Sequence, residues 1–257
     1  MRFASLGSGS EGNALIVEVA PDTRVMLDCG FALKECERRL ARLGLEAEGL
    51  AAIIVTHEHS DHLSGVLRLA RRYALPVYAT RGTLLGVVPR DLEGVEVRTI
   101  RAGSPFDIGA LAITPFAVPH DAREPVQFVL AHGARRLGVL TDVGRATPHV
   151  IAMLSGCDAL VLECNHDRAL LERCDYPASL KARIRGAYGH LDNEESARLL
   201  EALDRSRLGV VVAAHLSRRN NTVELARAAL ARVLGCAADA IPVADQDAGL
   251  PWIVVAD

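Results

Sequence analysis

The stretch His57-Glu58-His59-Ser60-Asp61-His62 places three histidines and an aspartate directly after the apolar run Ala51-Ala52-Ile53-Ile54-Val55-Thr56. Such a run predicts a buried strand, so these polar side chains would emerge where a rigid element ends. Residues two apart in an extended stretch point the same way, so His57 and His59 can bind one metal ion. Asp61 and His62 lie where a helix is predicted to begin and would face another direction. The spacing therefore predicts two metal ions.

Imidazole and carboxylate ligands suit zinc, manganese or iron, and the lack of neighbouring thiolates argues against a closed structural zinc site. The alternative is a polar loop that holds several histidines by chance, because short motifs do produce false matches. A site for two divalent metal ions needs further donors. We expect them at the ends of other predicted strands.

Three such donors exist: His120 follows the run 115–119, Asp142 follows 137–141 and His215 follows 210–214. Alone, each could be an ordinary core or turn residue, and aspartate is common in turns. Together with the residues of the cluster at 57–62, they supply enough donors for two metal ions. The predicted ligands are His57, His59 and His120 for one metal and Asp61, His62 and His215 for the other, with Asp142 as the bridging carboxylate.

The composition and length of the chain limit the class of protein to which it can belong. The chain has 257 residues, 50% of them hydrophobic, which fits one large domain or two tightly fused halves. No apolar stretch reaches the length of a membrane span, and the first residues lack the apolar segment of a secretory signal, so we expect a cytoplasmic protein without a membrane partner. The six cysteines show no CxxC spacing and are expected to be reduced structural thiols. A net charge of −3 gives no global positive field that would indicate nucleic acid.

Strand-like and helix-like segments alternate without a linker or a repeat, which predicts an α/β fold with sheets covered by helices. The predicted strands are residues 15–19, 25–27, 53–55, 77–79, 95–100, 111–118, 127–130, 137–140, 159–162, 209–213 and 252–255. The predicted helices are residues 33–43, 63–73, 194–203 and 223–234. A capping-box spacing of Asp192 and Glu195 opens the third helix, and Thr222 is the predicted N-cap of the fourth.

Residues 7–12 satisfy the dinucleotide-binding pattern GxGxxG, but a β-type run at 14–19 follows where that motif requires a helix. We therefore predict a strand, a glycine turn and a second strand. Two interpretations stay open: a tight turn alone, or a loop whose backbone N–H groups also face a substrate anion.

The series His57-x-His59-x-Asp61-His62, His120, Asp142 and His215, in this order, resembles the metallo-β-lactamase superfamily over nearly the whole chain. The resemblance implies a four-layer αββα sandwich with the metals at one sheet edge. It implies a single domain of residues 1–257 in two similar halves, approximately 1–130 and 131–257. It also implies that Asp28 hydrogen-bonds and orders the metal loop, for which a simple aspartate turn is the alternative.

His190 lies just before a predicted helix N-terminus, in Gly189-His190-Leu191-Asp192. By resemblance it matches a histidine that contacts the scissile phosphate in the branch with tRNA 3′-processing endonucleases and phosphodiesterases of cyclic phosphates. The helix N-terminus beside it would add N–H donors for an anion. A local backbone bond at the helix start is the alternative.

Four further motifs are similar to the YycJ/WalJ-like group of 5′ to 3′ DNA exonucleases. They are Leu6-Gly7-Ser8-Gly9-Ser10-x-Gly12-Asn13, Glu163-x-Asn165-His166-Asp167, Tyr176-Pro177-x-Ser179-Leu180-Lys181-x-Arg183-Ile184 and Ala214-His215-Leu216-Ser217-x-x-Asn220-Asn221. That resemblance implies a substrate pocket lined by His190 and by Asn13, Asn165, His166, Lys181, Asn220 and Asn221. The chain lacks a long insertion for a β-CASP domain or a tRNA-gripping arm, which disfavours large RNA substrates.

The resemblance implies a phosphodiesterase with two divalent metal ions, expected to act as a 5′ to 3′ exonuclease on single-stranded DNA. Its catalytic residues would be Asp61, Asp142 and His190. The metals would activate water and clamp the attacking and leaving oxygens, while His190 stabilises or protonates the departing side. Alternatives on the same scaffold are hydrolysis of small cyclic phosphates or nucleotides, hydrolysis of a thioester or lactam, a redox di-iron protein and a metal-dependent binding module. The oligomeric state stays open.

Overall fold

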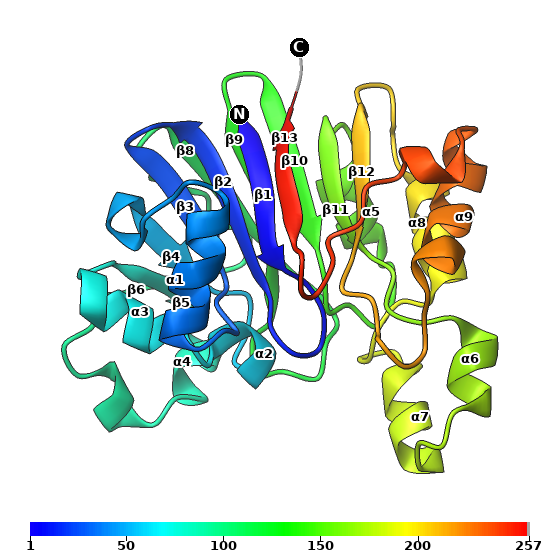
Figure 1. Ribbon diagram of the computed structural model, residues 1–257, viewed down its shortest axis with the longest axis horizontal. Helices are drawn as coiled ribbons and strands as arrows, with labels where there is room; N and C mark the ends of the chain where they lie inside the picture. Colours follow the sequence, from blue (N-terminus) through cyan, green and yellow to red (C-terminus); the bar gives the residue numbers. More distant parts are fainter. Residues whose placement is uncertain (256–257) are drawn as a thin grey trace.

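The computed structural model describes residues 1–255; residues 256 and 257 of the predicted single domain lie outside the described part. Two sheets pack face to face, and helices cover both outer faces (Figure 1). This arrangement confirms the predicted α/β class and the four-layer αββα sandwich. The first sheet takes its strands from residues 2–100 and from the closing strand 250–254, and the second from residues 106–214.

The elements are as follows. The first sheet has the order β13 (Leu250–Val254), β1 (Arg2–Gly7), β2 (Ala14–Ala20), β3 (Thr23–Leu27), β4 (Ala52–Ile54), β5 (Val77–Thr80) and β6 (Val97–Ile100). The second has the order β12 (Val210–Ala214), β11 (Ala159–Glu163), β10 (Arg135–Leu140), β9 (Val126–His132), β8 (Leu111–Ala117) and β7 (Phe106–Ile108). The α-helices are α1 (Leu33–Arg42), α2 (Ser60–Leu63), α3 (Val66–Tyr73), α4 (Arg81–Leu85), α5 (Pro148–Leu154), α6 (Arg168–Arg173), α7 (Ala178–Ile184), α8 (Asn193–Ala202) and α9 (Val223–Leu234). Short 3₁₀ helices are η1 (Ala47–Gly49), η2 (Pro89–Leu92) and η3 (Ala238–Ala240).

The central strands are continuous apolar runs because both of their faces are covered. In β4, Ile53 belongs to the cluster that packs against α1 and α3, whereas Ile54 belongs to the core between the sheets. In β11, Leu160 belongs to the cluster with α5, α8 and α9, and Val161 belongs to the core between the sheets. Neighbouring residues thus point to opposite faces, and three apolar clusters hold the four layers together.

Strand direction determines where the polar strand ends meet. Strands β3 to β6 run parallel to one another, as do β10, β11 and β12. The carboxyl ends of parallel strands lie at the same edge of a sheet, which is where ligands bind in open α/β sheets. Functional side chains are therefore expected in the segments that follow β4, β10 and β12.

The predicted helix starts are confirmed by their caps. The Asp192 side chain accepts from Glu195 N at the start of α8, and the Thr222 side chain accepts from Leu225 N at the start of α9. Gly235 ends α9 with φ 64°, a conformation that glycine adopts without strain. The predicted strand, turn and strand at residues 7–12 is also confirmed, because β1 and β2 pair antiparallel there.

Two differences from the sequence prediction have local causes. The predicted helix 63–73 is divided into α2 and α3 near Gly65, whose N–H donates to Cys29 O and where a Cβ would lie 1.9 Å from Phe31 O. The short helices α4, α6 and α7 were not predicted, because a helix of fewer than two or three turns shows too little periodicity to be recognised.

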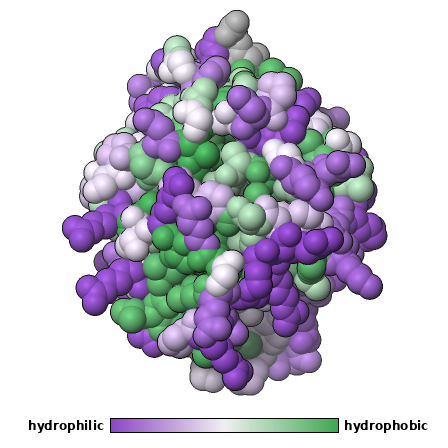
Figure 2. Space-filling view, turned by 90° about the vertical axis from the view of Figure 1, so that its left-hand side faces the viewer, coloured by the Kyte–Doolittle hydropathy of each residue, from purple (hydrophilic) through white to green (hydrophobic). Residues whose placement is uncertain are grey.

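The face at the left of Figure 1, which carries α3, has a groove of about 330 Å³ between α3 and the segment after α4. Figure 2 shows apolar residues gathered on this face and bordered by hydrophilic ones. The charged residues that line the groove are two acidic and two basic ones: Glu58, Asp91, Arg68 and Arg71.

Among residues 1–255, every helix is too short or too polar to cross a lipid bilayer. All six cysteines are free thiols, as predicted.

Candidate metal centre

Three site residues at strand ends adopt a left-handed backbone: Asp28 with φ 61°, Asp142 with φ 52° and His215 with φ 56°. A non-glycine residue in this conformation costs about 1 kcal/mol or more and persists only where its surroundings fix it. Glu163 Oε1 accepts from Asp142 N at 3.0 Å, and Ser8 Oγ accepts from His215 N at 2.9 Å. Strain that is fixed in this way at several neighbouring strand ends is typical of a functional site.

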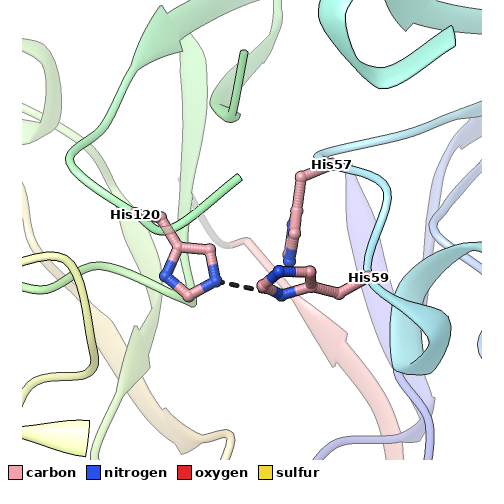
Figure 3. A group of neighbouring side chains, drawn as sticks. All are labelled: His57, His59 and His120. Carbon is pink, nitrogen blue, oxygen red and sulfur yellow. Dashed lines mark hydrogen bonds between the residues drawn. The ribbon is translucent and has the colours of Figure 1, made fainter. Parts of the chain in front are cut away.

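The first group of candidate ligands is His57, His59 and His120, whose ligand atoms lie within 4.8 Å of one another. Figure 3 shows the three imidazoles converging from the segments after β4 and β8. His120 Nε2 is 3.3 Å from His59 Nδ1. His57 Nε2 is buried and has no hydrogen-bond partner among the described residues. Since an unpaired buried imidazole nitrogen is costly, this group fits a divalent metal ion.

The second group is Asp61, His62, Asp142 and His215, again within 4.8 Å. His62 Nε2 lies 3.0 Å from Asp142 Oδ2 and 3.4 Å from Asp61 Oδ2. His215 Nε2 is 3.7 Å from Asp61 Oδ2, is buried, and has no hydrogen-bond partner in the described chain. Asp142 Oδ1 also lies 3.9 Å from His120 Nε2. Asp142 therefore stands between the two groups, where a bridging carboxylate would lie.

Asp28 contacts this centre through His62. Asp28 Oδ2 lies 2.8 Å from His62 Nδ1 and also accepts from Thr56 Oγ1 at 2.8 Å. Asp28 Oδ1 accepts from Thr56 N at 2.8 Å. A carboxylate bound to one imidazole nitrogen orients the ring and directs the other nitrogen toward a metal. Among the alternatives that the sequence left open for Asp28, this geometry favours support of the metal loop over a simple turn.

The glycine turn between β1 and β2 lies against the same centre. Asn13 Oδ1 accepts from Gly9 N at 2.9 Å, and Asn13 Nδ2 lies 3.4 Å from Asp61 Oδ2. Gln246 holds the turn from the other side: its Oε1 accepts from Glu11 N at 2.9 Å and its Nε2 donates to Gly12 O at 2.8 Å. Asn13, predicted to contact substrate, is therefore placed where it organises the turn and the ligand Asp61.

Glu163 is a site residue that sequence reasoning missed. It ends β11, is fully buried, and accepts from His190 Nδ1 at 2.9 Å and from His215 Nδ1 at 3.0 Å. Its second oxygen, Oε2, accepts from Val143 N at 3.2 Å and Leu191 N at 3.0 Å. The available signal was the one used for the other residues, a polar side chain at the end of an apolar strand.

Glu163 raises the pKa of His190. Burial by itself would raise the pKa of Glu163, but His190 and the hydrogen bonds from His190 and His215 outweigh it and lower this pKa to about 2. Burial would likewise lower the pKa of His190, yet the Glu163 carboxylate raises it above its ordinary value. Because Nδ1 is bound to Glu163, Nε2 is the nitrogen that remains for a ligand in the pocket.

A cavity of about 350 Å³ opens beside both ligand groups. Its wall includes His190 and Asn165 from the predicted substrate set, together with the ligands His59, Asp61, Asp142 and His215. Helix α7 contributes Arg183, which was not predicted; its Nε donates to Asp121 Oδ2 at 2.6 Å, and Asp121 also lines the cavity. The pocket therefore combines two cation-binding groups, an imidazole and a guanidinium, a combination that suits an anionic substrate.

The other predicted substrate residues do not line this cavity. Lys181 Nζ donates to Glu172 O at 2.6 Å, and the Asn221 amide is paired with Asn193 and Cys164 O. His166 and Asn220 are buried, and His166 Nδ1 and Asn220 Oδ1 have no hydrogen-bond partner among the described residues. Direct contact of these four residues with substrate stays a prediction.

Metal uptake by the metal-free protein should release protons. Burial would lower the pKa of His62, but Asp142 and Asp28 raise it well above its ordinary value. For His215, burial is likewise outweighed by Asp142, Asp61 and Glu163, which raise the pKa to about 10. Because a metal binds neutral imidazole, we expect about two protons to be released per chain at neutral pH, and affinity to rise with pH. Calorimetry in two buffers of different ionisation enthalpy measures this release; its absence would show that both imidazoles are already neutral.

Comparison with known proteins identifies the family of the chain. A family model described as the beta-lactamase superfamily domain matches residues 23–215. Exodeoxyribonuclease YycJ of Bacillus anthracis is 35% identical over 240 residues, covering 91% of this chain and 89% of that protein. Exodeoxyribonuclease WalJ of Streptococcus pneumoniae strain D39 is 32% identical over 233 residues, covering 88% and 85%.

The fold is also found in solved structures. The crystal structure of Zn²⁺-bound PqqB from Methylobacterium extorquens superposes with a TM-score of 0.75 at 19% identity, covering 99% of this chain and 100% of that one. The donor groups described above fit divalent metal ions, as the fold leads one to expect. The chain belongs to the metallo-β-lactamase superfamily and, within it, is a hydrolase of the YycJ/WalJ-like group.

Proposed function

We propose that the protein is a phosphodiesterase with two divalent metal ions that removes nucleotides from the 5′ end of single-stranded DNA. Two relatives that match most of the chain are named exodeoxyribonucleases, which supports a nucleic-acid substrate. The observation that supports the proposal most directly is the position of His190, in the pocket wall next to both ligand groups and bound to Glu163. A positively charged imidazole there suits the negative charge that develops on a phosphodiester during hydrolysis.

The residues fit a division of roles. His57, His59 and His120 would hold one cation and Asp61, His62 and His215 the other, with Asp142 shared. When bound, the two cations supply Lewis-acid chemistry, which activates water and neutralises charge on phosphoryl oxygens. These donors accept zinc, manganese or iron, and the PqqB relative binds zinc.

The remaining residues bind and orient the substrate. Arg183 places a guanidinium in the pocket wall, where its ion pair with Asp121 holds it. His190 holds a proton on Nε2, toward the pocket, and donates it to the leaving oxygen, while Glu163 stabilises the charged ring. Asp28 and Thr56 hold His62 in place through hydrogen bonds.

End-labelled oligonucleotides test the proposal. With a single-stranded DNA labelled at its 5′ end, we expect the label to appear in mononucleotides from the earliest times, and a chelator to abolish the reaction. Label that is released first from the 3′ end would reverse the polarity. Cleavage of nucleoside cyclic phosphates alone, or rapid hydrolysis of a glutathione thioester without diesterase activity, would contradict the proposal.

Glu163→Gln should shift the pH dependence of the reaction. Without the carboxylate, burial dominates and the pKa of His190 falls, so the alkaline limb of the pH–rate profile should move to lower pH. We expect turnover at neutral pH to fall by about 10- to 100-fold. Steady-state kinetics across the pH range measures both effects. Glu195→Gln is the matched control, because Glu195 lies in the adjacent helix α8 and pairs with Arg168 at the surface; an unshifted limb in Glu163→Gln would show that Glu163 does not set the protonation of His190.

A further inference from the structure

Three loops beside the pocket each place an exposed cationic or aromatic side chain within three residues of a site residue. The pairs are His120 with Arg123, Asp142 with Arg145 and His190 with Tyr188. None of the three exposed residues is part of the chemistry described above. We call Arg123, Arg145 and Tyr188 the outer rim.

The loops of the outer rim are bonded to one another. Gly144 N donates to Pro119 O at 2.8 Å, and Asp121 N donates to Tyr188 O at 3.0 Å. A Cβ on Gly144 would lie 2.5 Å from Tyr188 N, so the loop after β10 approaches the Tyr188 backbone too closely for any side chain there. The three loops of the outer rim therefore lie side by side next to the cavity, which Asp121, Asp142 and Gly189 line.

Tyr188 has the geometry of a stacking platform. Its side chain is 59% exposed, whereas every other aromatic side chain in the described chain is buried or half-buried. The backbone around it is fixed, because Gly189 N donates to Gly186 O and His190 N donates to Ile184 O, both at 2.8 Å. An exposed aromatic ring on a rigid backbone offers a flat apolar face to a ligand. Nucleic-acid bases stack on such rings regardless of sequence.

The two arginines supply positive charge without a counter-ion. The side chains of Arg145 and Arg123 make no hydrogen bond or ion pair with the described residues; only the Arg123 backbone N–H donates, to Glu58 Oε1 at 2.8 Å. Two exposed arginines at α7 are instead paired with carboxylates, Arg185 with Glu172 and Arg183 with Asp121. Two unpaired guanidinium groups beside an exposed ring match the alternating phosphates and bases of a nucleic-acid strand.

We propose that the outer rim binds the nucleotide adjacent to the one in the pocket. Its unpaired base stacks on Tyr188, and the flanking phosphates contact Arg145 and Arg123. This inference rests on the proposed action on nucleic acid and adds the path that the strand takes out of the cavity. It also assigns a reason for a preference for unpaired ends, since a base in a duplex cannot stack on Tyr188.

Four single variants test the path: Tyr188→Leu, Tyr188→Phe, Arg145→Gln and Arg68→Gln. For a single-stranded dodecanucleotide we expect Tyr188→Leu to raise KM by about 5- to 100-fold and Tyr188→Phe to restore wild-type KM. Arg145→Gln should reduce the salt dependence of binding by about 0.7 in log–log slope, as loss of one phosphate contact does for a single strand. Arg68 is the matched control, because it is exposed, makes no ion pair with the described residues and lies in the charge-balanced groove near α3.

A small diester separates the inference from the proposed function. Methyl p-nitrophenyl phosphate does not reach beyond the pocket, so all four variants should hydrolyse it within about twofold of wild type. If the wild type degrades the dodecanucleotide but Tyr188→Leu and Arg145→Gln behave as Arg68→Gln does, the outer rim is not the binding site and the nuclease function stands. If Arg68→Gln alone weakens binding, the strand leaves through the groove near α3. If the wild type hydrolyses only the small diester, the nucleic-acid function is wrong and the inference falls with it.

Discussion

Asp142→Asn is expected to lower the metal content to about one ion per chain or less and to reduce phosphodiester turnover by about 10³-fold or more. Asp142 is the carboxylate that stands between both ligand groups, 3.0 Å from His62 Nε2 and 3.9 Å from His120 Nε2. Asparagine keeps the shape of the side chain and tolerates the left-handed backbone at φ 52°, so the loss of charge is tested without new strain.

Metal analysis of the purified variant and turnover of an oligonucleotide measure the two effects. The control is Asp158→Asn, because Asp158 is also buried, just before β11, but pairs with Arg207 away from the candidate ligands. That control should lose stability and keep its metal. Full metal content in Asp142→Asn would show that Asp142 does not bridge the two groups.

His190→Ala is expected to reduce turnover by about 10²- to 10⁴-fold while leaving the metal content unchanged. A third group of possible ligand atoms within 4.8 Å consists of Asp142, Glu163, His190 and His215. The metal content of this variant therefore shows whether His190 acts as a metal ligand or as a proton donor. Glu163 keeps its bonds from Asp142 N and His215 Nδ1 in this variant, so the ligand groups stay supported.

The leaving group gives a second readout for His190. A proton donor matters most when the leaving oxygen is a poor leaving group. The loss in His190→Ala should therefore be larger for an oligonucleotide, which releases an alcohol, than for a p-nitrophenyl ester, which releases a stable phenolate. Equal losses on both substrates would assign His190 to charge stabilisation instead of proton transfer. Exposed His149→Ala is the control for a general effect of losing a histidine.

The sequence predicts those candidate site residues that are close together in the chain or that end a recognisable strand. The cluster at 57–62 is visible because its spacing is short, and Asp142 and His215 are visible because each follows a long apolar run. The same reasoning located the core strands, since a run such as Ile53 and Ile54 is apolar on both faces only when both faces are covered.

The roles of Glu163 and Arg183 could not be assigned in this way, although Glu163 does end an apolar strand. The role of Glu163 depends on three backbone N–H groups and two imidazoles that the parallel pairing of β10, β11 and β12 brings together, and no local spacing encodes that pairing. Arg183 looks like Lys181 and Arg185 in the sequence, a solvated basic helix face. Only the orientation of the short helix α7 shows which of the three faces the pocket.

The position of β13 has a consequence for the order of folding. This strand, residues 250–254, pairs with β1 at the edge of the first sheet, and the adjacent Gln246 holds the glycine turn that supports Asp61 and His215. While the chain is being synthesised, β1 therefore keeps an unpaired edge, and the turn at residues 8–13 lacks its anchor, until Gln246 and β13 have left the ribosome. The turn beside the candidate metal centre is thereby completed only after β13 has been made, and a nascent chain that has all the candidate ligands but not β13 would expose a strand edge open to aggregation.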